Sequence, residues 1–178
     1  MSTPNVAEAI DRLSAAISAD PAKARARNLP ATARLIDGLR CEVTGPYNER
    51  LVTDMAPAVG GTATGPNPGW LLRGALASCT ATVIAMRAAK LGVELGSLEV
   101  SVETDSDLRG ILGLDDNVSS GHGPVRINVR IGAPAAPAGL LREIVTWAEG
   151  HSPVNCTVRE APQCVLEIEV VEAKGDSE

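Results

Sequence analysis

The segment that most limits how this chain folds is a nearly uncharged run of small and apolar residues between Pro68 and Gly92. Proline favours the first turn of a helix and glycine the position just after its end, so the run predicts one helix over about 68–91. Apolar residues recur on one side of this helix, at Leu72, Leu76, Cys79, Val83 and Met86. Because the other sides are mostly alanine, we expect protein to surround the helix and the helix to form the centre of the fold.

The segments on both sides of this helix alternate apolar and polar residues, which is typical of half-buried strands. Predicted strands lie at 31–37, 39–45, 50–55, 97–104, 125–131 and 164–171, and further helices at 137–149 and 153–159. Ser152 and Pro153 have the residue types of a helix N-cap and first turn. Hairpins before and after the long helix predict an α+β fold with antiparallel sheets, and not a doubly wound parallel sheet.

A chain of 178 residues suits one domain with a real core. We assign 1–30 to an N-terminal helical extension, because Val6, Ile10, Leu13 and Ile17 fall at helical spacing. The range 31–172 forms the domain, and we expect the polar tail 173–178 to be disordered.

Composition disfavours several classes of function. The net charge of −6 gives no electrostatic basis for binding nucleic acid or an anionic membrane. The N-terminus lacks the pattern of a secretory signal, and Arg73 and Arg87 interrupt the most apolar stretch, so we expect a cytoplasmic protein with no membrane span. Four cysteines and two histidines lack zinc-site spacing, so we expect free thiols, no metal and no cofactor. Cys41 and Cys164 are predicted to point into the core from strands.

Two motifs resemble those of the OsmC/Ohr (organic hydroperoxide resistance) family. The first is GPNPGWLLRGALASCTATVIAMRAAKLG and the second, later in the chain, is HSPVNCTVREAP. The resemblance covers about 31–172. It implies an OsmC-like fold with a long buried central helix, in an intertwined homodimer. It also implies a cysteine-based peroxidase that reduces small organic hydroperoxides in defence against oxidative stress.

The resemblance further implies a two-cysteine mechanism, in which a cysteine of the central helix becomes sulfenic acid and a second cysteine resolves it as a disulfide. Cys79 matches the first position. The family's other positions differ here: Gly69 stands where the family has a glutamate, the loop before Asn67 has no arginine, and Ser152 stands in place of the second cysteine.

Two residues could compensate for these differences, so the candidate site comprises Cys79, Cys156 and His151. Cys156 lies one helical turn beyond Ser152, and would reach Cys79 only if the helices shift. An imidazolium at His151 could activate the thiol, with Arg73 as a weaker candidate cation. The alternative is that Cys79 is a buried inert residue, Cys156 an ordinary helix residue and His151 a solvent-facing one.

Three functions therefore remain open. The chain is a hydroperoxide reductase acting through Cys79, a binding or accessory protein that has lost peroxidase turnover, or a single-cysteine enzyme that uses an external thiol as reductant. We favour the first. We predict that peroxide oxidises Cys79 before the other cysteines, and that Cys79 and Cys156 do not form an efficient disulfide because their one-turn offset strains the bond.

Overall fold

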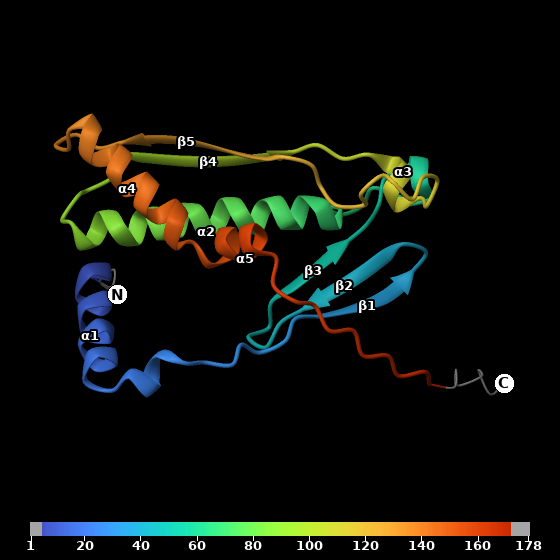
Figure 1. Ribbon diagram of the computed structural model, residues 1–178, viewed down its shortest axis with the longest axis horizontal. Helices are drawn as coiled ribbons and strands as arrows, with labels where there is room; N and C mark the ends of the chain where they lie inside the picture. The colour runs from blue at the N-terminus through green and yellow to red at the C-terminus, as the bar shows by residue number, and fades with distance from the viewer. Residues whose placement is uncertain (1–4, 172–178) are drawn as a thin grey trace.

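The computed structural model describes residues 5–171 and is organised around one long helix, α2, from Pro68 to Lys90 (Figure 1). The side chain of Asn67 caps its first turn by accepting a hydrogen bond from the Trp70 amide at 2.8 Å. Gly92, with a φ of +68°, follows its last turn in the left-handed conformation that glycine tolerates best. The predicted central helix is confirmed.

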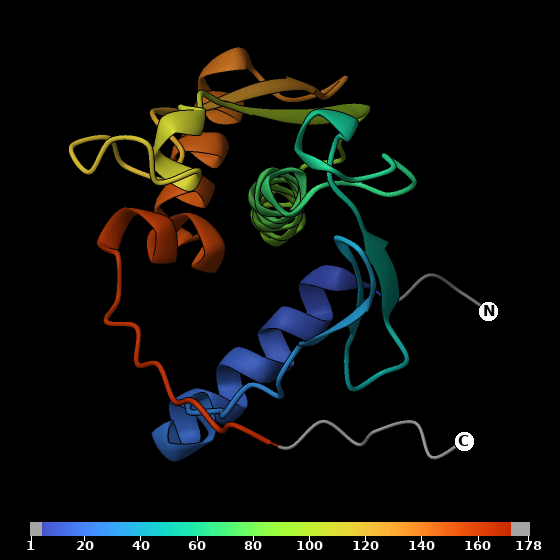
Figure 2. The same cartoon turned by 90° about the vertical axis from the view of Figure 1, so that its right-hand side faces the viewer.

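Two antiparallel sheets flank α2 on different sides (Figures 1 and 2). One sheet has the order β1-β2-β3, with strands Thr32–Asp37, Arg40–Thr44 and Arg50–Thr53. The other pairs β4 (Ser97–Thr104) with β5 (Val125–Gly132), in a register that runs from Ser97 opposite Gly132 to Thr104 opposite Val125. These strands confirm the predicted α+β class with antiparallel sheets.

The remaining helices pack around this frame. They are α1 (Val6–Ala19), α3 (Leu108–Ile111), α4 (Ala138–His151) and α5 (Pro153–Glu160), with short 3₁₀ turns η1 (Pro21–Ala24) and η2 (Pro57–Val59). The core lies where α2 and α4 meet, and its buried residues are Ile84, Ala88, Leu141, Ile144 and Ala148. Apolar residues of β4 and β5 pack against this cluster. The helical prediction for the N-terminal extension is confirmed by α1, and an ion pair joins Asp11 of α1 to Lys90 of α2.

The buried face of α2 differs from the predicted one. Its buried residues are Leu76, Thr80, Ile84 and Ala88, each four positions apart, whereas the prediction placed Met86 and Cys79 on the buried stripe. Helix α2 packs on α4, α5 and β4 along this rotated face, which leaves Met86 41% exposed. By length and composition alone α2 could cross a bilayer, but core helices of soluble proteins meet the same criterion.

The predicted strand at 164–171 is wrong for the single chain. After α5 the backbone runs away from α2 without regular secondary structure (Figure 1). Its apolar side chains are exposed: Val165 77%, Leu166 82%, Ile168 77% and Val170 92%. A strand forms only when a neighbour accepts its backbone hydrogen bonds, and within the described part of the chain no strand lies beside it.

Cys164 is likewise exposed and not a core residue, because it belongs to this unpaired segment; Cys41 on β2 is half-buried. The connection between β4 and β5 contains the short helix α3. The predicted disorder of the tail 173–178 lies outside the described residues.

Candidate functional site

The Cys79 thiol lies at the contact between α2 and α5. Its Sγ accepts a hydrogen bond from the Ser152 hydroxyl at 3.1 Å. Ser152 is fully buried, whereas Cys79 is half-buried and so retains access to solvent. The same Ser152 oxygen caps α5 by accepting a hydrogen bond from the Asn155 amide at 3.4 Å. The sulfur therefore lies at the N-terminal end of α5, where the helix dipole favours negative charge.

A second pair of side chains crosses the same contact one residue further along α2. Asn155 Nδ2 donates to Thr80 Oγ1 at 3.0 Å, and Thr80 Oγ1 lies 2.7 Å from the Leu76 carbonyl oxygen, to which it donates. Both polar residues are buried, with Thr80 1% and Asn155 4% exposed. Because buried polar groups are costly unless bonded, these bonds fix how α5 sits on α2.

The candidate Cys156 has different contacts from Cys79. Its Sγ lies 3.4 Å from the Gly150 carbonyl oxygen and 3.8 Å from a guanidinium nitrogen of Arg159. Arg159 in turn pairs with Glu149 of α4. The structure thus directs Ser152, and not Cys156, toward Cys79.

The candidate His151 is engaged with Trp147, one turn earlier on α4. Its Nδ1 donates to the Trp147 carbonyl oxygen at 2.6 Å, and the two rings stack with centroids 3.9 Å apart. The Arg87 guanidinium lies 4.5 Å from the centre of the same indole. These contacts hold the end of α4, and no hydrogen bond joins His151 to Cys79 within residues 5–171.

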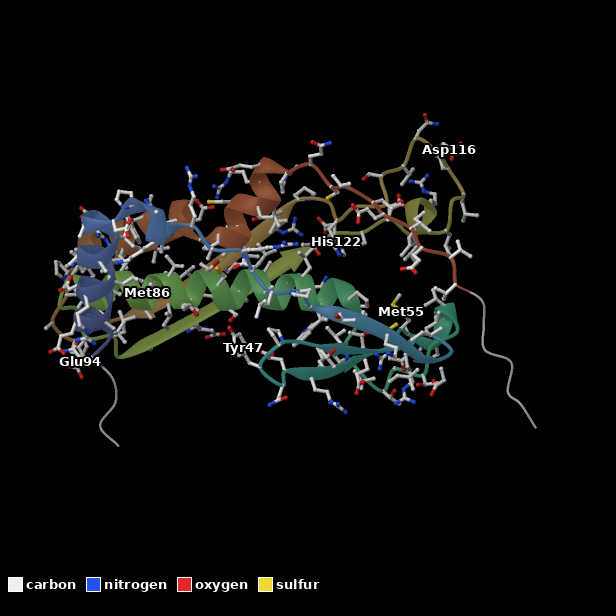
Figure 3. All side chains as sticks on the ribbon, turned by 90° about the horizontal axis from the view of Figure 1, so that it is seen from below. Tyr47, Met55, Met86, Glu94, Asp116 and His122 are labelled. Atoms are coloured by element: carbon white, nitrogen blue, oxygen red, sulfur yellow. The ribbon has the colours of Figure 1, made fainter. Side chains whose placement is uncertain are left out.

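The weaker candidate cation, Arg73, also bonds elsewhere, with its guanidinium donating to Thr104 Oγ1 on β4 at 3.3 Å. At Gly69, a Cβ would lie 2.9 Å from Nε2 of His122 (Figure 3), whose Nδ1 is 2.8 Å from Ser106 Oγ. The imidazole therefore occupies the space that a side chain at position 69 would need. Glutamate could not be introduced there unless His122 moved.

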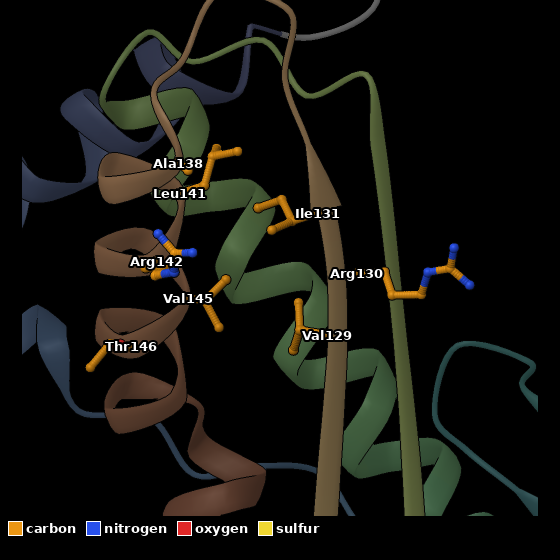
Figure 4. A pocket seen from close by; sticks show the side chains of 8 residues that line it. All are labelled: Val129, Arg130, Ile131, Ala138, Leu141, Arg142, Val145 and Thr146. Atoms are coloured by element: carbon orange, nitrogen blue, oxygen red, sulfur yellow. The ribbon is translucent and has the colours of Figure 1, made fainter.

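A small cavity of about 260 Å³ adjoins the α2–α5 contact and shares Leu76 and Asn155 with it. Its other lining residues are mainly apolar: Val125, Ile127, Glu149, Val158 and Arg159. A wider groove of about 570 Å³ lies between β5 and α4 (Figure 4). Val129 and Ile131 point toward the helices there, and Arg130 points away from them. Neither Cys79 nor Ser152 lines the groove or the smaller cavity, but the smaller cavity includes Leu76 and Asn155, which belong to the α2–α5 contact beside the thiol.

The titratable groups of the described residues do not gather into a metal site, since no cluster of three His, Cys, Asp or Glu occurs among them. The sequence did not reveal Thr80 and Asn155 as partners, nor that Ser152 bonds to Cys79. One signal was present: Ser152 occupies the position at which the resemblance expects a cysteine, and a cysteine that resolves another must lie within reach of it.

Comparisons with known proteins identify the family and the fold. The family model described as OsmC-like protein matches residues 61–167. The crystal structure of an OsmC-like protein from Mycoplasma pneumoniae superposes with a TM-score of 0.65 at 16% identity, over 76% of this chain and 89% of that one. For an organic hydroperoxide resistance protein from Legionella pneumophila the TM-score is 0.53 at 15% identity, over 75% and 92% of the two chains.

A third structure, the organic hydroperoxide resistance protein OhrB of Bacillus subtilis, gives a TM-score of 0.51 at 20% identity, over 75% of this chain and 91% of that one. A search of curated proteins gives no match. At such identities the structural likeness establishes the fold alone. The family model spans more than half of the sequence, and on that ground this chain belongs to the OsmC-like protein family.

Proposed function

We propose that this protein is a thiol peroxidase that reduces organic hydroperoxides through Cys79 and is regenerated by an external thiol. The observation that carries the proposal is the setting of the sulfur. Cys79 is half-buried, accepts a hydrogen bond from a buried hydroxyl and lies at the N-terminal end of α5. Such surroundings favour a thiolate, which is the nucleophilic form of cysteine.

The reaction would begin with attack of the Cys79 thiolate on the terminal oxygen of the hydroperoxide. A sulfur–oxygen bond forms as the oxygen–oxygen bond breaks, and the alkoxide leaves and takes a proton from solvent. The sulfur, oxidised by two electrons, becomes sulfenic acid. One external thiol then condenses with it, releasing water and forming a mixed disulfide. A second external thiol exchanges with that disulfide and frees Cys79. The cytoplasm, where we place the protein, keeps such thiols reduced.

The adjoining cavity supports an organic substrate over hydrogen peroxide. Leu76, Val125, Ile127 and Val158 line it, and these side chains would receive an apolar tail. The ion pair of Arg159 and Glu149 also lines the cavity and makes part of its wall polar.

The second candidate function is a binding or accessory role without turnover. It is favoured by one observation, that no cationic side chain bonds to the Cys79 sulfur anywhere in residues 5–171. A slow or absent reaction with peroxide is the expected outcome for such a protein.

Kinetics of peroxide consumption distinguish the two roles. We expect the reduced protein to consume cumene hydroperoxide in the presence of a dithiol, and the Cys79→Ser variant not to do so. Replacement of Cys41, Cys156 and Cys164 together by serine serves as the matched control and leaves turnover in place. Mass spectrometry after one equivalent of peroxide should find the first oxidation at Cys79. Oxidation of Cys164 with Cys79 untouched would rule out the peroxidase.

We further propose that the working unit is an intertwined homodimer. In the single chain α2 is buried along one stripe only, and the β1–β2–β3 sheet exposes Leu35 by 64% and Leu39 by 42%. Tyr47, at the turn between β2 and β3 (Figure 3), is 78% exposed. The unpaired apolar segment 164–171 needs a strand neighbour, and a second copy would supply one. Sedimentation velocity at micromolar concentration tests this, and a compact folded monomer would contradict it.

A further inference from the structure

We propose that Ser152 is the residue that stabilises the Cys79 thiolate, and that Asn155 is the positioning residue that keeps Ser152 directed at the sulfur. The inference rests on the proposed function in one respect, that the thiolate of Cys79 is the reactive species. Because a hydroxyl does not form a disulfide, Ser152 cannot act as a resolving residue, and the inference assigns it the role of hydrogen-bond donor instead.

The hydrogen bonds around Ser152 determine where its one proton points. The oxygen accepts from the Asn155 amide at 3.4 Å, so a lone pair is already used on the side of α5. Its proton is therefore free for Cys79 Sγ at 3.1 Å. A donor to sulfur stabilises the thiolate more than the thiol. Ser152 is 0% exposed, so water does not compete with the sulfur for this proton.

Asn155 fixes this arrangement through a parallel contact. Cys79 and Thr80 are adjacent on α2, while Ser152 and Asn155 are three positions apart along α5. The bond from Asn155 Nδ2 to Thr80 at 3.0 Å therefore runs beside the bond from Ser152 to Cys79. Because Thr80 passes its own proton to the Leu76 carbonyl oxygen, the amide has a fixed acceptor. Without this contact α5 can shift on α2, and the Ser152 hydroxyl no longer points at the Cys79 sulfur.

Other groups that could stabilise the thiolate are engaged elsewhere. His151 bonds to Trp147, Arg73 to Thr104, and Arg159 pairs with Glu149. Across the described ranges, Ser152 is the one side chain with a hydrogen bond to Cys79 Sγ. The negative charge thus depends on one hydroxyl and on the dipole of α5, which begins at the same residue.

The test is the rate at which iodoacetamide alkylates Cys79 as a function of pH, measured by peptide mass spectrometry on the otherwise native protein. Loss of a hydrogen bond to a charged group predicts about a tenfold slower reaction near neutral pH for Ser152→Ala and Ser152→Gly, with the whole profile displaced to higher pH. Glycine is the cleaner of the two, because it retains most of the capping preference. Ser152→Thr retains the hydroxyl and should restore most of the rate.

Two further variants separate the chemistry from stability. Asn155→Leu keeps a similar volume and should slow alkylation less than Ser152→Gly does. Asn67→Ala removes an N-cap far from the thiol, and it should lower the melting temperature without moving the pH profile. An unchanged profile in Ser152→Gly, with the variant folded, would overturn the inference.

Alkylation uses no peroxide, so the two proposals fail separately. If the profile depends on Ser152 but the wild type does not reduce cumene hydroperoxide, the inference stands and the peroxidase does not. If the wild type reduces peroxide and Ser152→Gly alkylates normally, the peroxidase stands and the role of Ser152 is lost.

Discussion

Two regions of this protein differ in whether the single chain supplies the partners that their residues need. At the contact between α2 and α5, short polar side chains are buried and paired, with Ser152 bonded to Cys79 and Asn155 to Thr80. In the segment 164–171, Leu166, Ile168 and Val170 alternate with glutamates much as apolar residues do in β4, but they are exposed and unpaired. In the first region one chain supplies all of these hydrogen-bond partners. The second has the composition of a strand, but the described residues provide no strand beside it.

The difference shows what each kind of structure requires. A helix satisfies its own backbone, so α5 needs only a cap and a surface to pack on, both supplied locally by Ser152 and α2. A strand depends on a partner that can belong to another molecule. We therefore expect the contact between Cys79 and Ser152 to form within a single chain, and the exposed sheet edges and outer faces of α2 to be covered only if the proposed dimer forms.

The largest effect is expected from charge in the unpaired segment. Each of Leu166 and Ile168, when buried in a dimer, contributes about 2 kcal/mol. Aspartate at both positions removes this burial free energy and places two charges in the proposed interface. We expect the dimer to dissociate or the protein to unfold, as measured by sedimentation velocity and circular dichroism.

The matched control for this prediction is Glu167→Gln, on the opposite side of the same segment. It should leave the sedimentation coefficient unchanged. A double aspartate variant that behaves like the wild type would show that 164–171 is as exposed in solution as it is in the single chain.

The next prediction tests the contact that is complete within one chain. Ser152→Cys places a second sulfur where an oxygen now lies 3.1 Å from Cys79 Sγ. A disulfide then requires an approach of only about 1 Å. After one equivalent of cumene hydroperoxide, non-reducing peptide mapping should find Cys79 linked almost completely to the introduced sulfur.

The wild type is the comparison for this variant. It should show no stoichiometric Cys79–Cys156 bond, and excess peroxide should drive its Cys79 to sulfinic acid, from which Ser152→Cys would be protected. A Cys79–Cys156 disulfide in the wild type would restore the two-cysteine mechanism and contradict the one-cysteine cycle.

The same contrast explains how far the sequence could predict the structure. Periodicity and capping residues are local, and they located α2, α4, α5 and strands β1 to β5 correctly. Two things depended on packing between distant segments. The buried face of α2 is rotated to Thr80 and Ile84, because α4, α5 and β4 decide which side is covered. Whether 164–171 pairs as a strand cannot be predicted from this segment alone, because pairing depends on a partner strand elsewhere.

At the site, the motif located Cys79, but the sequence could not say which side of α5 faces it. One helical turn separates Ser152 from Cys156, and only tertiary packing decides between them. The roles of Cys79, Cys156 and His151 remain predictions, and the contacts of the last two with Arg159 and Trp147 are what the structure adds.

A moderate effect is expected at the loop between β3 and α2, which leads into the helix that carries Cys79. The Thr62 hydroxyl, followed by the Thr64 amide, holds the pKa of the buried Asp54 carboxyl well below its usual range. Because its folded pKa is depressed, Asp54 stabilises the fold above about pH 4 and loses this effect as the pH falls toward the folded value. Asp54→Asn should melt earlier at pH 7, with a difference from the wild type that narrows below pH 4 in a thermal melt. A difference independent of pH would contradict the ionised role.

The smallest loss of stability is expected at the exposed N-terminal end of α2, which Asn67 caps. This site can be compared with the cap of α5 at Ser152, which also contacts the Cys79 thiol. Asn67 caps α2 from an exposed position, whereas Ser152 caps α5 from a buried one and bonds to Cys79 as well. Asn67→Ala should cost about 1 kcal/mol of unfolding free energy, as N-cap losses usually do. Urea unfolding followed by circular dichroism measures this loss. Ser152→Ala should cost more in the same experiment, because it leaves the Asn155 amide without its partner in a buried site. Equal losses would mean that burial adds nothing to the cap at Ser152, and that the α2–α5 contact tolerates movement that its hydrogen bonds were expected to prevent.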